Sequence, residues 1–244
     1  MSQSLPDLLP VIRKLERSSA LSEDDRSKLL ALPGRHERVG PAQVLIRQGD
    51  PVGDCCFLVR GFAFRHKGTR CGKRQIISFH MDGDILDLQH LKLPQADHSV
   101  ETLSDADLVW VGRSEIERLM KDAPNLADAL WRDTLVDASI YREWILNLGR
   151  RNARSQIAHL LCELATRRSC ADIGETDRFE LPMTQEHIAD ATGMTVVHVN
   201  RTLRALTEEG AIERHSREVH VRDWARLETI ADFDPAYLHL GSGA

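Results

Sequence analysis

The stretch "MTQEHIADATGMTVVHVNRTLRALTEEGAI" (residues 183–212) decides the fold of the C-terminal part of the chain. Thr184 can cap a short helix with its hydroxyl, and Gly193 lies where the backbone has to turn sharply. Thr195 can then cap a second helix, whose apolar residues share one face: Val199, Leu203 and Leu206. Two helices joined by a three-residue turn that contains glycine predict a helix-turn-helix.

The other side of the second helix is polar and carries no acidic residue. A pair of helices that only packs explains the apolar face equally well, but it leaves this polar side unexplained. Arginine can donate two hydrogen bonds to guanine, asparagine can pair with adenine, and valine can contact a thymine methyl. Hydroxyls and helix N-terminal amides can hold phosphates. The predicted DNA contacts are Thr184, Gln185, Thr195, Val196, Val197, His198, Asn200, Arg201 and Arg204.

The segment after the second helix predicts a wing. "AIERHSREVHV" (residues 211–221) has the pattern of a strand, a tight turn and a second strand. "DWARLETI" (residues 223–230) is expected to form a short helix capped by Asp223. A winged helix-turn-helix is therefore expected within residues 150–244.

Residues 36–113 differ in character, with short alternating or β-branched runs separated by Gly and Asp. Regular short strands with such turns predict an antiparallel sandwich or roll. Two short amphipathic helices are expected before residue 36, the second one capped by Ser22, and "KGTRCGK" (residues 67–73) is expected at a hairpin tip. The predicted fold class is α+β, with a β-roll sensor domain over residues 1–122.

A long helix is expected over "NLADALWRDTLVDASIYREWILNLG" (residues 125–149), ending at Gly149. Apolar residues fall on two of its faces, so we expect one face to pack on the sheet and the other on a second copy of the chain. A helix buried within one chain is the alternative. We assign residues 123–149 to dimerisation. The predicted contact seam consists of residues spaced alternately four and three apart: Leu130, Thr134, Tyr141, Trp144 and Leu148. The neighbouring face carries Leu135, Ala138 and Ile145.

The composition limits the classes of protein that need be considered. The chain has 42% hydrophobic and 28% charged residues. It contains no apolar run near the about 18 residues of a membrane span, so a cytoplasmic protein is expected. The net charge of −5 leaves DNA binding open, because only the local placement of basic residues matters. Five cysteines without a C-x-x-C pair predict neither a disulfide framework nor a zinc site.

Taken together, these motifs resemble the cyclic-AMP receptor protein/FNR (Crp/Fnr) family of bacterial transcription regulators over nearly the full chain. The cyclic-nucleotide-binding-like β-roll is matched by "GDPVGDCCFLVRGFAF" (residues 49–64), "GKRQIISFHMDGD" (72–84) and "HSVETLSDADLVWV" (98–111). The winged helix-turn-helix is matched by residues 183–212. The resemblance implies a homodimer that reads a palindromic DNA site, with half-site centres about one helical turn apart. It also implies RNA polymerase as a partner.

The chain departs from the family in both of its functional regions. Arg201 matches the recognition-helix arginine that contacts guanine, but Val197 stands where the best-known members carry a glutamate, so a different half-site is expected. The family's Gly-Glu-Leu run and Arg-Ser pair, which hold the phosphate of cyclic AMP, correspond to residues 87–89 and 98–99. The phosphate-pairing arginine is absent, and cyclic AMP binding is not expected. We expect a different effector at Asp87, Gln89, His98 and Ser99, unless the regulator needs no ligand.

The sequence does not support a cofactor or redox site. No cysteine precedes Cys55, which argues against the family's N-terminal iron–sulfur cluster. His80, His90 and His98 match no ligand spacing for a metal or haem, and a β-roll oxygenase would need the missing H-x-H pair, so no enzyme is expected. Ordinary thiols are preferred over redox regulation for three cysteines: Cys71, Cys162 and Cys170. The leading hypothesis is a homodimeric, sequence-specific DNA-binding transcription regulator.

Overall fold

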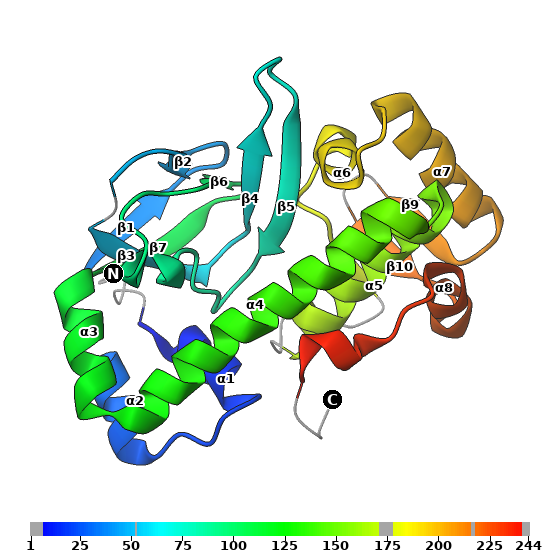
Figure 1. Ribbon diagram of the computed structural model, residues 1–244. Coiled ribbons are helices and arrows are strands. Elements are labelled where there is room, and N and C mark those ends of the chain that lie inside the picture. Colours follow the sequence, from blue (N-terminus) through cyan, green and yellow to red (C-terminus); the bar gives the residue numbers. More distant parts are fainter. Residues whose placement is uncertain (1–6, 52, 171–177, 216–217, 241–244) are drawn as a thin grey trace, which may run out of the picture. The chain divides into compact units, whose positions relative to one another are not determined.

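The computed structural model describes residues 7–51, 53–170, 178–215 and 218–240 (Figure 1). It has the α+β class that the sequence predicts. Contacts divide the chain into two compact units, a sensor unit of Met1–Lys67 and Ser78–Asp137 and a C-terminal unit of Gly68–Ile77 and Ala138–Ala244. The division falls inside the long helix, whereas the sequence placed domain borders at residues 122 and 149.

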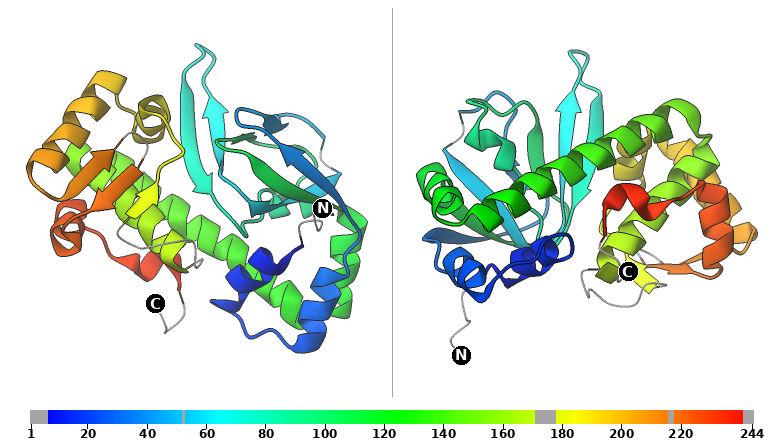
Figure 2. Two further views of the ribbon diagram at one scale, coloured as in Figure 1. Left: turned by 180° about the vertical axis from the view of Figure 1, so that it is seen from behind. Right: turned by 60° about the horizontal axis from the view of Figure 1, so that its bottom comes forward.

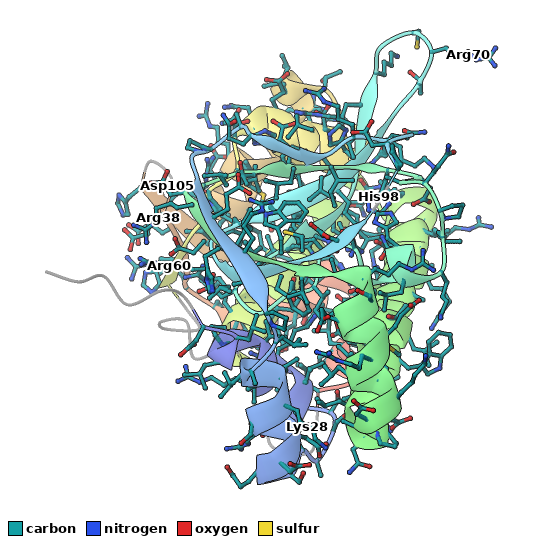
Figure 3. The ribbon with its side chains drawn as sticks, turned by 90° about the vertical axis from the view of Figure 1, so that its left-hand side faces the viewer. Lys28, Arg38, Arg60, Arg70, His98 and Asp105 are labelled. Carbon is teal, nitrogen blue, oxygen red and sulfur yellow. The ribbon has the colours of Figure 1, made fainter. Side chains whose placement is uncertain are left out.

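The N-terminal half of the chain forms an antiparallel roll of seven strands in two sheets, which confirms the predicted architecture (Figures 1 and 2). One sheet has the order β1-β7-β3 and the other β2-β6-β4-β5. The strands are β1 (Gly34–Val39), β2 (Val44–Ile46), β3 (Asp54–Arg60), β4 (Ala63–Gly68), β5 (Arg74–His80), β6 (Ser99–Thr102) and β7 (Ala106–Gly112). The β4–β5 hairpin carries Arg70 at its extended tip (Figure 3), as "KGTRCGK" predicted.

Strand β3 is buried on both faces because it separates two cores. Phe57 and Val59 point into a core shared with the helices, while Cys56 and Leu58 point into the interior of the roll. Successive side chains of a strand alternate between faces. The side chains of "CCFLV" therefore pack into two cores, one on each face of the strand. This explains why the run does not alternate between apolar and polar residues.

Four helices and one 3₁₀ turn complete the sensor unit: α1 (Leu9–Glu16), α2 (Glu23–Leu30), η1 (Leu88–Leu91), α3 (Arg113–Asp122) and the first half of α4 (Pro124–Arg150). Ser22 caps α2 as predicted, since its Oγ accepts a hydrogen bond from the Asp25 amide at 3.1 Å. Helix α1 lies against the roll at Gly83, which has a φ of +90°. A Cβ at Gly83 would lie 2.5 Å from the Pro10 carbonyl oxygen, so only glycine permits this approach.

The C-terminal unit has the predicted winged helix-turn-helix. Its elements after α4 are α5 (Ala153–Cys170), β8 (Arg178–Glu180), α6 (Gln185–Thr192), α7 (Val196–Glu208), β9 (Ile212–His215), β10 (Glu218–Val221), α8 (Trp224–Ala231) and η2 (Pro235–Leu238). Helix α5 contacts α6, α7 and α8, and the wing strands join β8 in a sheet of order β8-β10-β9. Asp223 caps α8 as expected, because its Oδ1 accepts from the Arg226 amide at 2.9 Å.

The seam predicted on α4 needs correction. Leu130 is fully buried in the sensor core, and the buried Trp144 donates its indole N–H to Glu163 Oε2 at 3.0 Å. Both side chains are used inside the protomer and are not free for a partner. The large apolar side chains that α4 exposes are Trp131, Leu135, Ile145, Leu146 and Leu148. Only Leu148 was in the predicted seam, while Leu135 and Ile145 were assigned to the neighbouring face.

The shift between the two faces has a simple geometric reason. Moving a seam by one residue rotates it about 100° around a helix. Because α4 is apolar on two faces, its periodicity alone does not show which face packs into the core of its own chain. Thr134 and Tyr141, the remaining members of the predicted seam, are half-buried. The helix also continues through Gly149 to Arg150. Among the described residues, no helix has the length and apolar character needed to cross a bilayer.

Candidate nucleic-acid interface

The starts of α6 and α7 are held by local hydrogen bonds, and the sequence predicted the two threonine caps among them. Thr184 Oγ1 accepts from the His187 amide at 3.3 Å, and His187 Nδ1 accepts from the Thr184 amide at 3.1 Å. Gly193 ends α6 in the left-handed region with a φ of +68°. Thr195 Oγ1 then accepts from the His198 amide at 3.2 Å and starts α7. Gly193 and the Thr195 cap therefore set where α6 ends and α7 begins.

Helix α7 has the two faces that the pattern predicted. Its buried face holds Val199, Leu203 and Leu206, each without solvent exposure. On the other face, Val197 is 80% exposed and Asn200 is exposed beside it. A valine so exposed gains nothing from its own fold. Val197 therefore offers an exposed apolar surface near the start of α7.

The polar side chains of α7 differ in how they are held. Asn200 Nδ2 donates to Gln185 Oε1 at 3.2 Å, which links α7 to α6. Arg204 Nε lies 2.7 Å from Glu208 Oε1, which corrects the expectation that no carboxylate neutralises this side. Among the described residues, Arg201 pairs with no carboxylate and is exposed. Arg201 is therefore the arginine of α7 whose charge is available to a ligand.

The remaining predicted contacts surround these residues. Thr184, Thr195 and Val196 are exposed, and Gln185 and His198 are half-buried. The structure thus brings all nine predicted residues onto α6, the turn and α7.

The predicted effector residues lie in or next to a buried polar cluster of the sensor unit. Asp87 is fully buried, and its Oδ1 accepts from the Cys56 amide at 2.7 Å, while burial raises the pKa of its carboxyl. His98 (Figure 3) is also buried, and its Nδ1 lies 2.7 Å from Asp97 Oδ1. Burial, followed by the charge of Arg65, lowers the pKa of His98 to about 4. A neutral imidazole and a buried carboxyl therefore occupy the positions where the resemblance placed phosphate-binding residues.

His90, which the sequence did not place among the effector residues, lies beside His98 with ring centroids 6.0 Å apart. Two buried atoms of this cluster, His90 Nε2 and His98 Nε2, lack a hydrogen-bond partner among the described residues, while Asp87 Oδ2 and His90 Nδ1 lie 3.5 Å apart. Ser99 Oγ accepts from the Gln48 amide at 3.0 Å, and Gln89 is half-buried. Within the described ranges, no group of three or more His, Cys, Asp or Glu residues has the arrangement of a metal site.

The cysteines fall into two groups. Burial raises the pKa of the Cys162 thiol, which favours the protonated form. Cys71 is exposed at the hairpin, and a contact of 3.1 Å with Thr69 Oγ1 lowers the pKa of its thiol. The side chain of Cys170 lies outside the described residues.

Comparison with known proteins agrees with both halves of this description. Residues 36–123 match the cyclic nucleotide-binding domain, and residues 155–230 match the Crp-like helix-turn-helix domain. The transcriptional activator protein FnrL of Cereibacter sphaeroides is 31% identical over 189 residues, which cover 76% of this chain and 75% of that protein. The transcriptional activator protein anr of Pseudomonas aeruginosa is 25% identical over 213 residues, covering 87% of this chain and 86% of the relative.

Solved structures show the same architecture. The structure of FixK2 from Bradyrhizobium japonicum superposes with a TM-score of 0.75 at 25% identity and covers 82% of this chain and 98% of that one. The c-di-GMP responsive regulator CLP of Xanthomonas campestris has a TM-score of 0.67 at 14% identity, over 83% of this chain and 100% of its own, which speaks for the fold alone.

Proposed function

Because the chain belongs to the Crp/Fnr family of DNA-binding transcription regulators, we propose that two copies read a palindromic DNA site through α7. The observation that carries this proposal is the exposed row on α7, where Val197, Asn200 and the unpaired Arg201 face away from the domain core. Half-sites about one helical turn apart would present one major groove to each α7. We propose no enzymatic activity.

Each residue of the row has a distinct part in recognition. Arg201 donates two hydrogen bonds to a guanine, and Asn200 pairs with an adenine when its amide leaves Gln185. Val197 presses on a thymine methyl in place of the glutamate that other members direct at cytosine. The half-site read by this chain therefore contains a thymine at that position. Thr184, Thr195 and the amides at the starts of α6 and α7 hold phosphates and set the register.

RNA polymerase is the proposed protein partner, since the matched relatives FnrL and anr are named transcriptional activators. The proposed place of action is the cytoplasm, where bacterial DNA lies. The seam between the two copies would be the exposed apolar face of α4 that contains Leu135 and Ile145.

Selection of bound sequences from random DNA tests the proposal directly. We expect a palindrome with guanine and thymine at fixed positions of each half-site, bound by a dimer in sedimentation analysis. Recovery of sequences without two-fold symmetry would contradict recognition of DNA by a symmetric homodimer. A random pool recovered without enrichment would contradict sequence-specific binding altogether.

For the sensor unit we propose a polar effector other than a cyclic nucleotide, bound at the cluster of Asp87, His90 and His98. A buried polar atom without a partner costs about 1–3 kcal/mol, which a ligand that completes its hydrogen bonds would offset. A cyclic phosphate does not suit these groups, because Asp87 is a carboxyl and the nearby Arg65 is bound to Asp137 at 2.9 Å and to the Leu86 carbonyl oxygen at 2.7 Å. A regulator without a ligand remains the competing proposal.

Thermal shift of the purified protein separates these possibilities. We expect cyclic AMP to leave Tm unchanged, and an absorbance spectrum to show whether haem or another chromophore is bound. A polar ligand that raises Tm in the wild type and not in His98→Phe would support the effector site. A cyclic nucleotide that raises Tm in the wild type would contradict our proposal.

A further inference from the structure

A cavity of about 180 Å³ lies in the C-terminal unit between α6 and the wing. Thr184, Gln185 and Ile188 line it from the α6 side, and Arg214 and Val219 line it from the wing. Thr184 and Gln185 are predicted DNA contacts, so the cavity adjoins the interface described above. Arg214 is a charged residue of the cavity lining that was not among the predicted DNA contacts.

The alternation of β9 explains why an arginine faces inward. Ile212 is buried in the domain core, and Arg214 follows it two residues later on the same side of the strand. The Cα partner of Arg214 on β10 is Val219, which is also buried. The guanidinium therefore leaves the strand toward α6 and the cavity.

Arg214 is partly desolvated and has no counter-charge among the described residues. Its Nε is buried without a hydrogen-bond partner. Glu213, its neighbour in sequence, contacts His215 and Arg222 instead. Burial alone lowers the pKa of the Arg214 guanidinium, and no nearby carboxylate offsets that effect. Burying a charge without a partner is unfavourable, so this position is suited to an anion supplied from outside.

We propose that Arg214 and the rim of this cavity form a receptor for one phosphodiester group of the DNA backbone. The guanidinium donates to the phosphate oxygens in a fork geometry, and Thr184 and Gln185 contact the same backbone from α6. Strand β9 and α6 thereby hold one phosphate from two sides and position α7 in the adjoining groove. A contact to phosphate carries no base information, so Arg214 adds affinity and register to every DNA sequence alike. The inference rests on DNA binding by α7, but it assigns a separate residue and a separate contact.

Salt-dependent DNA binding tests this assignment. Arg214→Met keeps most of the apolar stem and removes the charge, while Arg214→Lys keeps the charge. Arg226→Gln is the matched control, because Arg226 is exposed on α8 and lies outside the cavity lining. Binding to the selected palindrome and to random duplex is measured over a series of KCl concentrations, with Tm recorded to confirm folding.

We expect Arg214→Met to weaken both kinds of DNA by a similar factor, about tenfold for each half-site. The slope of log K against log [KCl] should fall by about 0.9 for each protomer. Arg214→Lys should retain the wild-type slope, and Arg226→Gln should change neither quantity measurably. The ratio of palindrome to random binding should stay unchanged in all three variants.

Three outcomes would overturn the inference. The first is a wild-type slope in Arg214→Met. The second is weakening confined to the palindrome, which would indicate a base contact. The third is binding of inorganic phosphate at Arg214 while the slope stays unchanged, which would assign the cavity to a free anion. Failure of the wild type to bind any DNA would instead refute the function itself, so the two failures are distinct.

Discussion

Lys14 and Asp133 form an ion pair of 2.7 Å that ties α1 to α4 within the sensor unit. The same ammonium lies 3.0 Å from Asp84 of the roll, so one cation joins three elements. One turn further along α4, Asp137 pairs with Arg65 at 2.9 Å. The first half of the long helix is thus attached to the roll by two adjacent and largely buried ion pairs.

Removing the cation of this cluster is expected to be strongly destabilising. Lys14→Met leaves Asp133 and Asp84 buried without their shared partner, and we expect a loss of about 3–5 kcal/mol in the free energy of unfolding. The double variant Lys14→Met/Asp133→Leu should lose less free energy of unfolding than Lys14→Met alone, because the buried Asp133 carboxylate is removed together with its partner. Urea unfolding measures both values. A double variant less stable than the single one would show that the pair itself, and not the stranded charge, stabilises the unit.

The buried His80 predicts a loss of stability in acid. Burial, followed by the charge of Arg65, lowers the pKa of His80 from its ordinary 6.5 to about 4. Between these values the unfolded chain binds a proton that the folded protein does not. The contribution of His80 is therefore fully present above pH 6.5 and is lost as the pH falls toward 4.

Replacement of the imidazole checks this dependence. His80→Gln should be less sensitive than the wild type when urea unfolding is compared at about pH 7 and about pH 4.5. Part of the sensitivity should remain, because the pKa of His98 is lowered to about 4 as well. Equal acid sensitivity in His80→Gln and the wild type would argue against protonation of His80.

The exposed face of α4 predicts where two copies meet. Ile145 is 71% exposed on this face, so Ile145→Glu should shift the dimer toward monomer in sedimentation analysis. Leu30→Glu is the matched control, since Leu30 is 43% exposed on α2. We expect it to leave the oligomeric state unchanged. If Ile145→Glu remained as dimeric as the control, another surface would have to form the interface.

The two arginines of α7 should behave differently on DNA. Arg201 is free of carboxylates among the described residues, and Arg201→Ala should relax specificity at one guanine at a cost of about 1–3 kcal/mol per half-site. Arg204 already pairs with Glu208, so Arg204→Ala should weaken all sequences to a small and similar extent. Competition binding against single-base variants of the selected site distinguishes them. Unchanged discrimination in Arg201→Ala would remove this residue from base recognition.

Features set by neighbours along the chain could be read from the sequence. Thr184 and Thr195 cap helices through amides three residues along the chain, Gly193 ends α6 with a positive φ, and the helices they delimit were predicted. The alternating strands of the roll and the wing follow from the same short-range periodicity. The family resemblance rests on these local patterns too, which is why it reached both halves of the chain.

Features that depend on which distant surfaces meet were decided only by tertiary packing. Both apolar faces of α4 look alike in sequence, and the core of the sensor unit took the face with Leu130, leaving Ile145 exposed. His90 entered the buried polar cluster because η1 brings it beside His98. Arg214 lines the cavity beside α6 because β9 directs its side chain to that side. Helix caps and apolar periodicity involve residues only a few positions apart, so the sequence shows them directly. Burial of a side chain depends on which distant segment packs against it, and a single stretch of sequence does not contain that segment.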